Sequence, residues 1–190
     1  MIIQGGRGTG WSAGVNEENR LITEAVNTSA EHHVNHYSRL SFNSVFEITT
    51  ENVATRCFYY LKNSDDTDIS VEGLTIALDK ATEITVELGN IGDPDSGTAV
   101  TPVNLNVGSG NVADGTFEVG EDLGNAGATL TGGATCERYV YTAALQSTTL
   151  NFEQDIIVRK NSVLTLWSSV AQVKVQGTLI FNYHNVGFAI

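Results

Sequence analysis

The chain has 190 residues and a mass of 20.3 kDa, a length typical of one domain, with or without an added segment. Its 10 Lys and Arg against 22 Asp and Glu give a net charge of -12. This balance argues against nucleic acid and against an anionic membrane surface as main partners, because both attract basic proteins. Charged residues are only 17%, whereas Thr (21), Gly (19) and Asn (16) are abundant. Such a composition favours strands and turns, and it fits all-β proteins that pack into assemblies.

Residues 1–19 predict an extended, glycine-rich N-terminal arm. Five glycines between Gly5 and Gly14 disfavour a helix or strand of its own here. The arm has no signal-peptide-like apolar core, and no stretch of the chain approaches the roughly 20 apolar residues of a membrane span. We therefore expect an intracellular chain as made. Trp11 is expected to dock on its own domain or on a neighbouring subunit.

From residue 20 onward the sequence predicts strands and turns within one domain, 20–190. A short strand is expected over Leu21–Val26, with a helix over 17–26 as its rival. A long β-like stretch follows over His33–Thr50, in which Leu40, Phe42 and Val45 are assigned to the interior.

The next predicted strands have clearer patterns. Arg56–Lys62 is apolar and aromatic, and a turn follows it. Ile69–Leu78 alternates but changes phase at Gly73, which predicts a bulge or bend. Ile84–Leu88 alternates again.

Residues 89–133 form a long irregular excursion, too long for a plain connection. One short strand is expected inside it over Val103–Val107 and another around Phe117–Val119. We expect this excursion to be a functional face or to contain strands that the sequence pattern does not resolve.

The last predicted strands are Cys136–Tyr141, Ile156–Val158, Val163–Trp167 and Val173–Tyr183. Eight to ten short strands separated by turns predict a β-sandwich or barrel. The long connection and the long strands favour a jelly-roll-like antiparallel β-sandwich.

Motifs of catalysis and cofactor binding do not occur in the sequence. It has no Gly-x-Ser-x-Gly, His-Glu-x-x-His or Cys-x-x-Cys motif, and the glycines at 5–10 lack the Lys-Ser/Thr of a phosphate loop. We therefore predict no catalytic, cofactor-binding or metal residues, and no enzyme. Cys57 and Cys136 are interpreted as reduced core cysteines, and a disulfide would require neighbouring strands.

Two clusters of possible metal ligands have simpler explanations. On a strand, His32 and His36 lie about 13 Å apart, too far for one ion. They are interpreted as interface residues, with a site on an oligomer axis kept as an alternative. The acidic stretches Asp65–Asp68 and Asp93–Asp95 could supply oxygens to calcium, but Asp also simply favours turns.

The aromatic residues of the predicted strands are expected mainly in the core. A sugar-binding groove is the alternative that they leave open. These residues are Phe58, Tyr59, Tyr60, Tyr139, Tyr141, Trp167, Phe181 and Tyr183.

Three stretches of the chain resemble a group of small virion proteins of tailed phages. Gly14–Val26 resembles their N-R-L-x-T-x-A-V opening, and Phe58–Asp66 is similar to their L-x-L-K-N-x-x-D strand and turn. Gly97–Asn106 with Ser109–Ala113 resembles their G-T-A-V-T-x-V-N-L-N-x-x-S-x-N-V-A segment, and it is the most specific of the three.

The resemblance implies a structural subunit of the virion, with no catalytic residues to carry over. The expected role is a capsid cement or decoration protein on the capsid surface. It would be made in the host cytoplasm, would form a homotrimer and would bind the major capsid protein. A tail, neck, head-spike or receptor-binding component is the alternative within the virion, and a carbohydrate-binding module is the alternative from another class. Contacts are expected from the arm and the histidines, namely Arg7, Trp11, Val15, Arg20, His32 and His36.

Overall fold

The structure is a computed structural model that describes residues 3–4, 12–13, 40–124, 129–142 and 146–184. The chain divides into two compact units, residues 1–30 and 31–190. In the first unit, β1 (Ile3–Gln4) pairs antiparallel with β2 (Ser12–Ala13). The prediction that this glycine-rich segment forms no strand of its own is therefore wrong. The strand predicted over Leu21–Val26 lies outside the described residues, and the boundary at residue 20 stays a prediction.

The described part of the second unit is all-β. Its strands are β3 (Ser41–Thr49), β4 (Arg56–Asn63), β5 (Asp68–Leu78), β6 (Thr82–Leu88), β7 (Thr98–Ala99), β8 (Val103–Asn104), β9 (Gly115–Val119), β10 (Ala134–Tyr141), β11 (Ser147–Val158), β12 (Val163–Ser168) and β13 (Lys174–His184).

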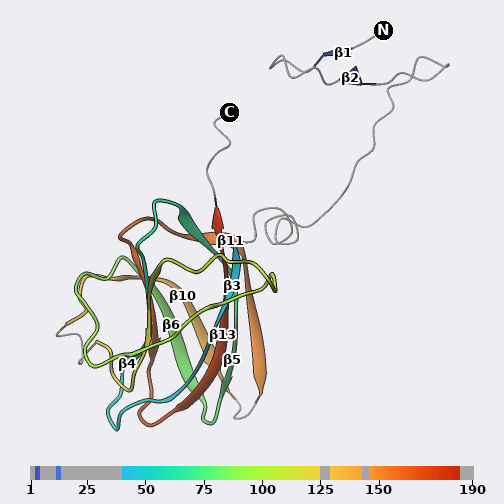
Figure 1. Cartoon of the computed structure of the whole chain (residues 1–190). Helices are drawn as coiled ribbons and strands as arrows, with labels where there is room; N and C mark the ends of the chain where they lie inside the picture. The colour runs from blue at the N-terminus through green and yellow to red at the C-terminus, as the bar shows by residue number, and fades with distance from the viewer. Residues whose placement is uncertain (1–2, 5–11, 14–39, 125–128, 143–145, 185–190) are drawn as a thin grey trace. The chain divides into compact units, whose positions relative to one another are not determined.

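These strands form two antiparallel sheets that share one main hydrophobic core (Figure 1), which makes the unit a β-sandwich. One sheet has the order β10-β6-β12-β4-β9-β7, and the other has the order β11-β5-β13-β3-β8. Within the described residues, no helix is long and apolar enough to cross a membrane.

Aromatic rings from both sheets meet in the core. Phe181 of β13 lies 5.6 Å from Phe42 of β3 in its own sheet, and 5.3 Å from Phe117 of β9 in the opposite sheet, between ring centroids. All three rings are buried. Aromatic pairs at these spacings add to the stabilisation from buried area, so this cluster joins the two layers.

The bulge predicted at Gly73 is confirmed. The pairing of β5 with β11 shifts between Val71 and Gly73, and so does the pairing of β5 with β13. A Cβ at this position would lie 2.8 Å from the backbone oxygen of Leu150. The close approach of β11 therefore requires glycine here.

Two predicted side-chain placements are wrong. Val45 was assigned to the interior, but it is 61% exposed, because Phe42, Ser44 and Phe46 set the inward phase of β3. Cys136 was assigned to the core, but it is exposed on β10, while Cys57 is buried. Both thiols are unpaired.

The excursion at 89–133 contributes β7, β8 and β9, and the segment lies across one side of the sandwich (Figure 1, yellow-green). β9 pairs with β4, β7 extends that sheet by pairing with β9, and β8 pairs with β3 in the other sheet. The strand predicted over Val103–Val107 ends at Asn104, and the side chain of Val107 is 98% exposed. The excursion thus supplies the outermost strands of both sheets on one side.

Candidate interaction site

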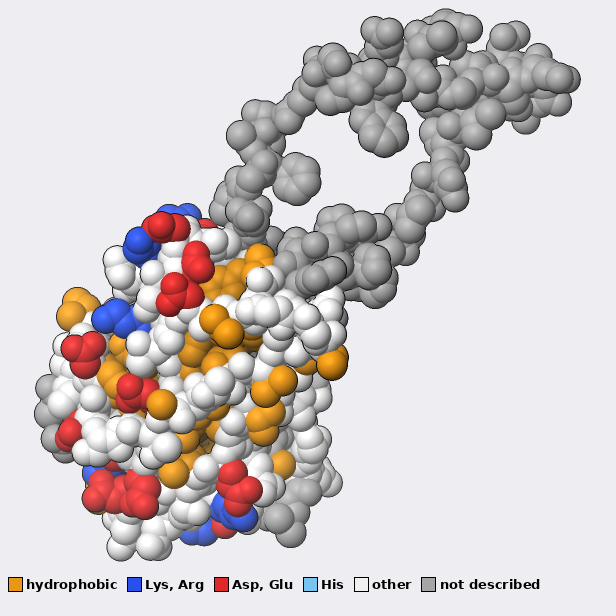
Figure 2. Space-filling view, in the orientation of Figure 1, with side chains coloured by type: hydrophobic (Ala, Val, Ile, Leu, Met, Phe, Trp, Pro, Cys, Tyr) orange, Lys and Arg blue, Asp and Glu red, His pale blue; other side chains and the backbone are white. Residues whose placement is uncertain are grey.

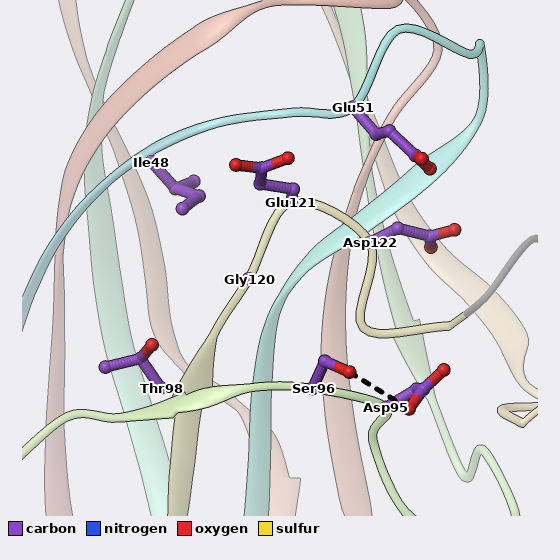
Figure 3. Close-up of a pocket in the computed structure, with 8 residues that line it drawn as sticks. All are labelled: Ile48, Glu51, Asp95, Ser96, Thr98, Gly120, Glu121 and Asp122. Carbon is purple, nitrogen blue, oxygen red and sulfur yellow. Dashed lines mark hydrogen bonds between the residues drawn. The ribbon is translucent and has the colours of Figure 1, made fainter.

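A cleft of about 410 Å³ opens where the end of β3 faces the segments around β7 and β9. Three segments that are distant in sequence supply its walls (Figure 3). We call it the acidic cleft, and its lining residues are Ile48, Glu51, Asp95, Ser96, Thr98, Gly120, Glu121 and Asp122.

Backbone hydrogen bonds fix the three segments relative to one another. The Glu51 N–H donates to the carbonyl oxygen of Glu121 (3.1 Å), and the Asp95 N–H donates to that of Leu123 (2.9 Å). The Leu123 N–H in turn donates to the carbonyl oxygen of Cys57 in β4 (2.8 Å). The cleft therefore has walls held by the main chain and not only by side chains.

A buried arginine balances part of the negative charge of the cleft. The Arg56 Nε lies 3.1 Å from Asp122 Oδ2 and 3.3 Å from Glu51 Oε2. The side chains of Arg56 and Asp122 are only 7% and 10% exposed. Four carboxylates against one guanidinium leave a formal charge of -3, counted as -4 + 1. This surplus favours a cationic group from a partner.

The neighbouring strand β9 carries a further acid close to this region. Burial raises the pKa of the Glu118 carboxyl, and the negative charge of Asp93 raises it further. A cation arriving near the cleft would relieve this repulsion, because an opposite charge favours the ionised carboxylate.

The acidic stretches considered for calcium have protein partners in the structure. Asp65 accepts a hydrogen bond from the Thr67 N–H (2.7 Å), and Asp66 forms an ion pair with Lys160. Among the described side chains, no group of three His, Cys, Asp or Glu is arranged to hold a metal ion.

An open strand edge adjoins the acidic cleft. β8 pairs only with Phe42 and Asn43 of β3. In the described part of the chain, no strand lies beside Val45–Thr49 on the edge that faces away from β13. Ile48 belongs both to this stretch and to the lining of the cleft. The edge and the cleft therefore form one continuous surface.

Exposed aliphatic side chains lie on β3, on β8 and on the excursion. Val45 on β3 and Val103 on β8 are both exposed, and Val107 and Val112 of the excursion are exposed as well. Figure 2 shows one face of the molecule on which hydrophobic side chains gather centrally, while most charged ones lie toward its rim. Apolar area with a polar rim is typical of protein-interaction surfaces.

The aromatic residues considered for a sugar-binding groove lie mostly inside the sandwich. Phe58, Tyr59, Tyr60 and Phe181 are fully buried, Tyr141, Trp167 and Tyr183 are nearly so, and only Tyr139 is half-buried. The prediction that they mainly pack in the core is confirmed. They do not form a surface row.

None of the contact residues predicted from the sequence can be placed by the structure. Arg7, Trp11, Val15, Arg20, His32 and His36 all lie outside the described residues. The cleft residues were missed, because Glu51, Asp95 and Asp122 come from separate loops with no shared motif. Two features of the sequence could have pointed to the cleft. One is the turn at Asp93–Asp95, and the other is Arg56, a charged residue at the start of an otherwise apolar strand.

The fold and site define an all-β sandwich with an acidic cleft beside an open strand edge. Comparison with protein-family models, curated proteins and solved structures found no match to this chain.

Proposed function

We propose that this chain is a structural protein of a phage virion, a capsid cement or decoration protein that binds the major capsid protein. The resemblance of Gly97–Asn106 and Ser109–Ala113 to phage virion proteins supports this role. These residues belong to the excursion that carries β7, β8 and the exposed valines. The segment that motivates the proposal therefore lies on the surface best suited to a partner.

The strand order is the observation that carries the proposal furthest. When β7, β8 and β9 are treated as an insertion, eight strands remain. We number these eight strands 1 to 8 in chain order. One sheet then has the order 1-8-3-6, which is β3-β13-β5-β11. The other sheet has the order 2-7-4-5, which is β4-β12-β6-β10. This order supports a jelly roll, an architecture found in viral capsid proteins and in lectins.

Because a fold does not imply a function, the surface must support the role as well. A decoration protein needs contacts to a lattice and to its own copies, and the exposed valines with the acidic cleft supply apolar and electrostatic contacts for both. We propose a homotrimer, since closed symmetry suits a subunit repeated over a capsid.

The proposal is tested by the copy number of this chain in purified particles of the phage that encodes it. Peptide-calibrated mass spectrometry should find hundreds of copies per particle for a capsid decoration protein. A copy number near a dozen would move the chain to the tail or neck, and its absence from particles would contradict a virion role.

Deletion of residues 1–19 tests the arm within the same proposal. The truncated chain should keep its β-rich circular dichroism spectrum but fail to bind particles that lack the wild-type protein. If the truncated chain binds these particles as fully as the wild-type chain does, the arm is not part of the interface, and the proposed virion role still stands.

A further inference from the structure

Along the edge of β3 that faces away from β13, a regular row of backbone groups has no partner among the described residues. Backbone groups of successive strand residues point to opposite edges. The Leu105 N–H donates to the Ser41 oxygen toward β8, and the Thr50 N–H donates to the Val173 oxygen toward the β13 side. The odd-numbered residues of β3 therefore direct their N–H and C=O groups away from β13. For Val45, Glu47 and Thr49, no backbone partner lies on that edge within the described residues. We call this row the open β3 edge.

The other long outer strands are interrupted, and this edge is not. The ladder of β10 with β6 shifts between Thr135 and Glu137. The ladder of β11 with β5 shifts between Asn151 and Ile156. Bulges of this kind prevent edge-to-edge pairing. The register of β3 with β13 runs without a shift over Ser41–Thr49. The open β3 edge is thus a regular template for an added strand.

The acidic cleft at the end of this edge selects for a strand that carries a positive charge. Most described basic side chains are already engaged. Arg56, Lys62, Arg138, Lys160 and Lys174 form ion pairs, and Lys80 donates to backbone carbonyls. None of these engaged side chains is free to balance the surplus charge of the cleft, which therefore favours a further cationic group.

The first 16 residues of the chain have the matching chemistry. They contain Arg7 and no acidic residue, whereas residues 17–190 carry 22 acidic and 9 basic residues, a balance of -13. Part of this segment already adopts β structure, in β1 and β2. Residues 1–30 also cluster as a unit distinct from residues 31–190. An identical element exchanged between copies is a low-cost route to a symmetric oligomer.

We infer that the open β3 edge binds the N-terminal segment, residues 1–16, of a second copy of this chain, with Arg7 directed to the acidic cleft. The inference rests on the proposed function, because it names the self-contact of that assembly subunit. Backbone hydrogen bonds to Val45, Glu47 and Thr49 supply the pairing. Exposed Val45 and Val103 flank the docked strand, and the Arg7 charge fixes its register.

Cross-linking between two distinguishable copies tests this inference. The exposed Cys136 is changed to Ser in every chain to remove the reactive surface thiol. One copy then carries Val45→Cys and a large tag, and the other carries Gln4→Cys and no tag. The two full-length chains are co-expressed, purified and treated with a short bismaleimide. Thr49→Cys serves as a second edge position in case Val45→Cys perturbs folding, and circular dichroism verifies folding of each variant.

Covalent heterodimers containing both chains should form at least roughly tenfold faster than with a matched control, because docking raises the effective concentration of the two thiols. The control places the cysteine at Val140→Cys, which is 69% exposed on β10. Arg7→Glu on the Gln4→Cys chain should return the rate to that of the control, whereas Arg20→Glu should not.

Two results would overturn the inference. One is equal cross-linking of the edge and control positions. The other comes from a variant that carries Val45→Cys and Gln4→Cys in one chain: a cross-link that forms only within that chain, and none between the two singly substituted copies, would place the segment on its own sandwich. The assay contains no phage particle, so its failure leaves the virion proposal standing. Absence of the chain from virions would likewise leave a positive cross-link intact.

Discussion

The outermost strands on the two sides of the sandwich differ in length and regularity. On one side, β10 and β11 are the outermost strands, and each contains a shift in its ladder. On the other side, β7 and β8 are only two residues long and cover β9 and β3 in part. Edges are usually protected against pairing. The regular edge beside the acidic cleft is therefore the feature on which the proposed docking of a partner strand depends.

The ion pairs differ between the two sides in the same way. Arg56 is buried with Asp122 beside the cleft, whereas Arg138 on β10 pairs with Glu83 while remaining mostly exposed. A buried charge depends strongly on its partner, and an exposed one does not. Loss of the ion pair beside the cleft should therefore lower the stability of the fold, whereas loss of the ion pair on β10 should not.

The largest expected effect comes from the core that both sides share. Phe181→Ala should lower the free energy of unfolding by about 3–5 kcal/mol, because it leaves a cavity between rings of both sheets. Urea unfolding followed by tryptophan fluorescence measures this loss. Phe181→Leu, which keeps most of the volume, should cost clearly less. Equal losses for both variants would contradict the packing of this ring between Phe42 and Phe117.

The buried ion pair should give the next largest effect. Arg56→Met should destabilise the sandwich by about 3 kcal/mol, since it leaves the Asp122 carboxylate buried without this cation. Arg138→Met is the matched control on the other side and should cost about 0.5 kcal/mol or less. Thermal unfolding of both variants measures the difference. A similar cost at both positions would remove the contrast between the two sides.

The smallest effect concerns Glu118 and depends on pH. Its pKa in the folded chain is raised above the ordinary value of 4.5, so the folded state favours the protonated form. The resulting stability is present below the unfolded pKa and is lost as the pH rises through the folded pKa. Glu118→Gln should therefore raise the melting temperature relative to wild type at pH 7 and have less effect at pH 4.

The expected gain for Glu118→Gln is small, within about 0.5 kcal/mol, because solvent still screens this partly buried group. Glu137→Gln on β10 controls for the loss of one negative charge. A difference from wild type that is the same at pH 4 and pH 7 would argue against a raised Glu118 pKa as its cause.

Local patterns in the sequence predicted most of the strands. Alternation and aromatic runs located β4, β5, β6, β12 and β13, and the change of phase located the bulge at Gly73. These signals are reliable because strand periodicity and burial act over a few residues. Val45 was misplaced because an exposed valine is indistinguishable from a buried one in sequence, and the inward phase of β3 is set by Phe42 and Phe46 instead.

The cleft and the open edge could not be predicted from the sequence. Glu51 and Asp122 are 71 residues apart, counted as 122 - 51, and the pairing of β9 with β4 together with long-range backbone hydrogen bonds brings them to one Arg56. The edge depends on where β8 stops pairing with β3, which is a property of the sheet and not of β3 itself. Both features arise from long-range topology, for which local periodicity carries no signal.

Amide hydrogen exchange along β3 of the full-length chain tests the central claim most directly. The amides of Ser44, Phe46 and Ile48, which point to β13, should be protected at every concentration. Those of Val45, Glu47 and Thr49 should become protected only when copies associate, and should lose this protection in the Arg7→Glu variant. Rapid exchange of these three amides in the associated state would contradict strand docking at the open β3 edge.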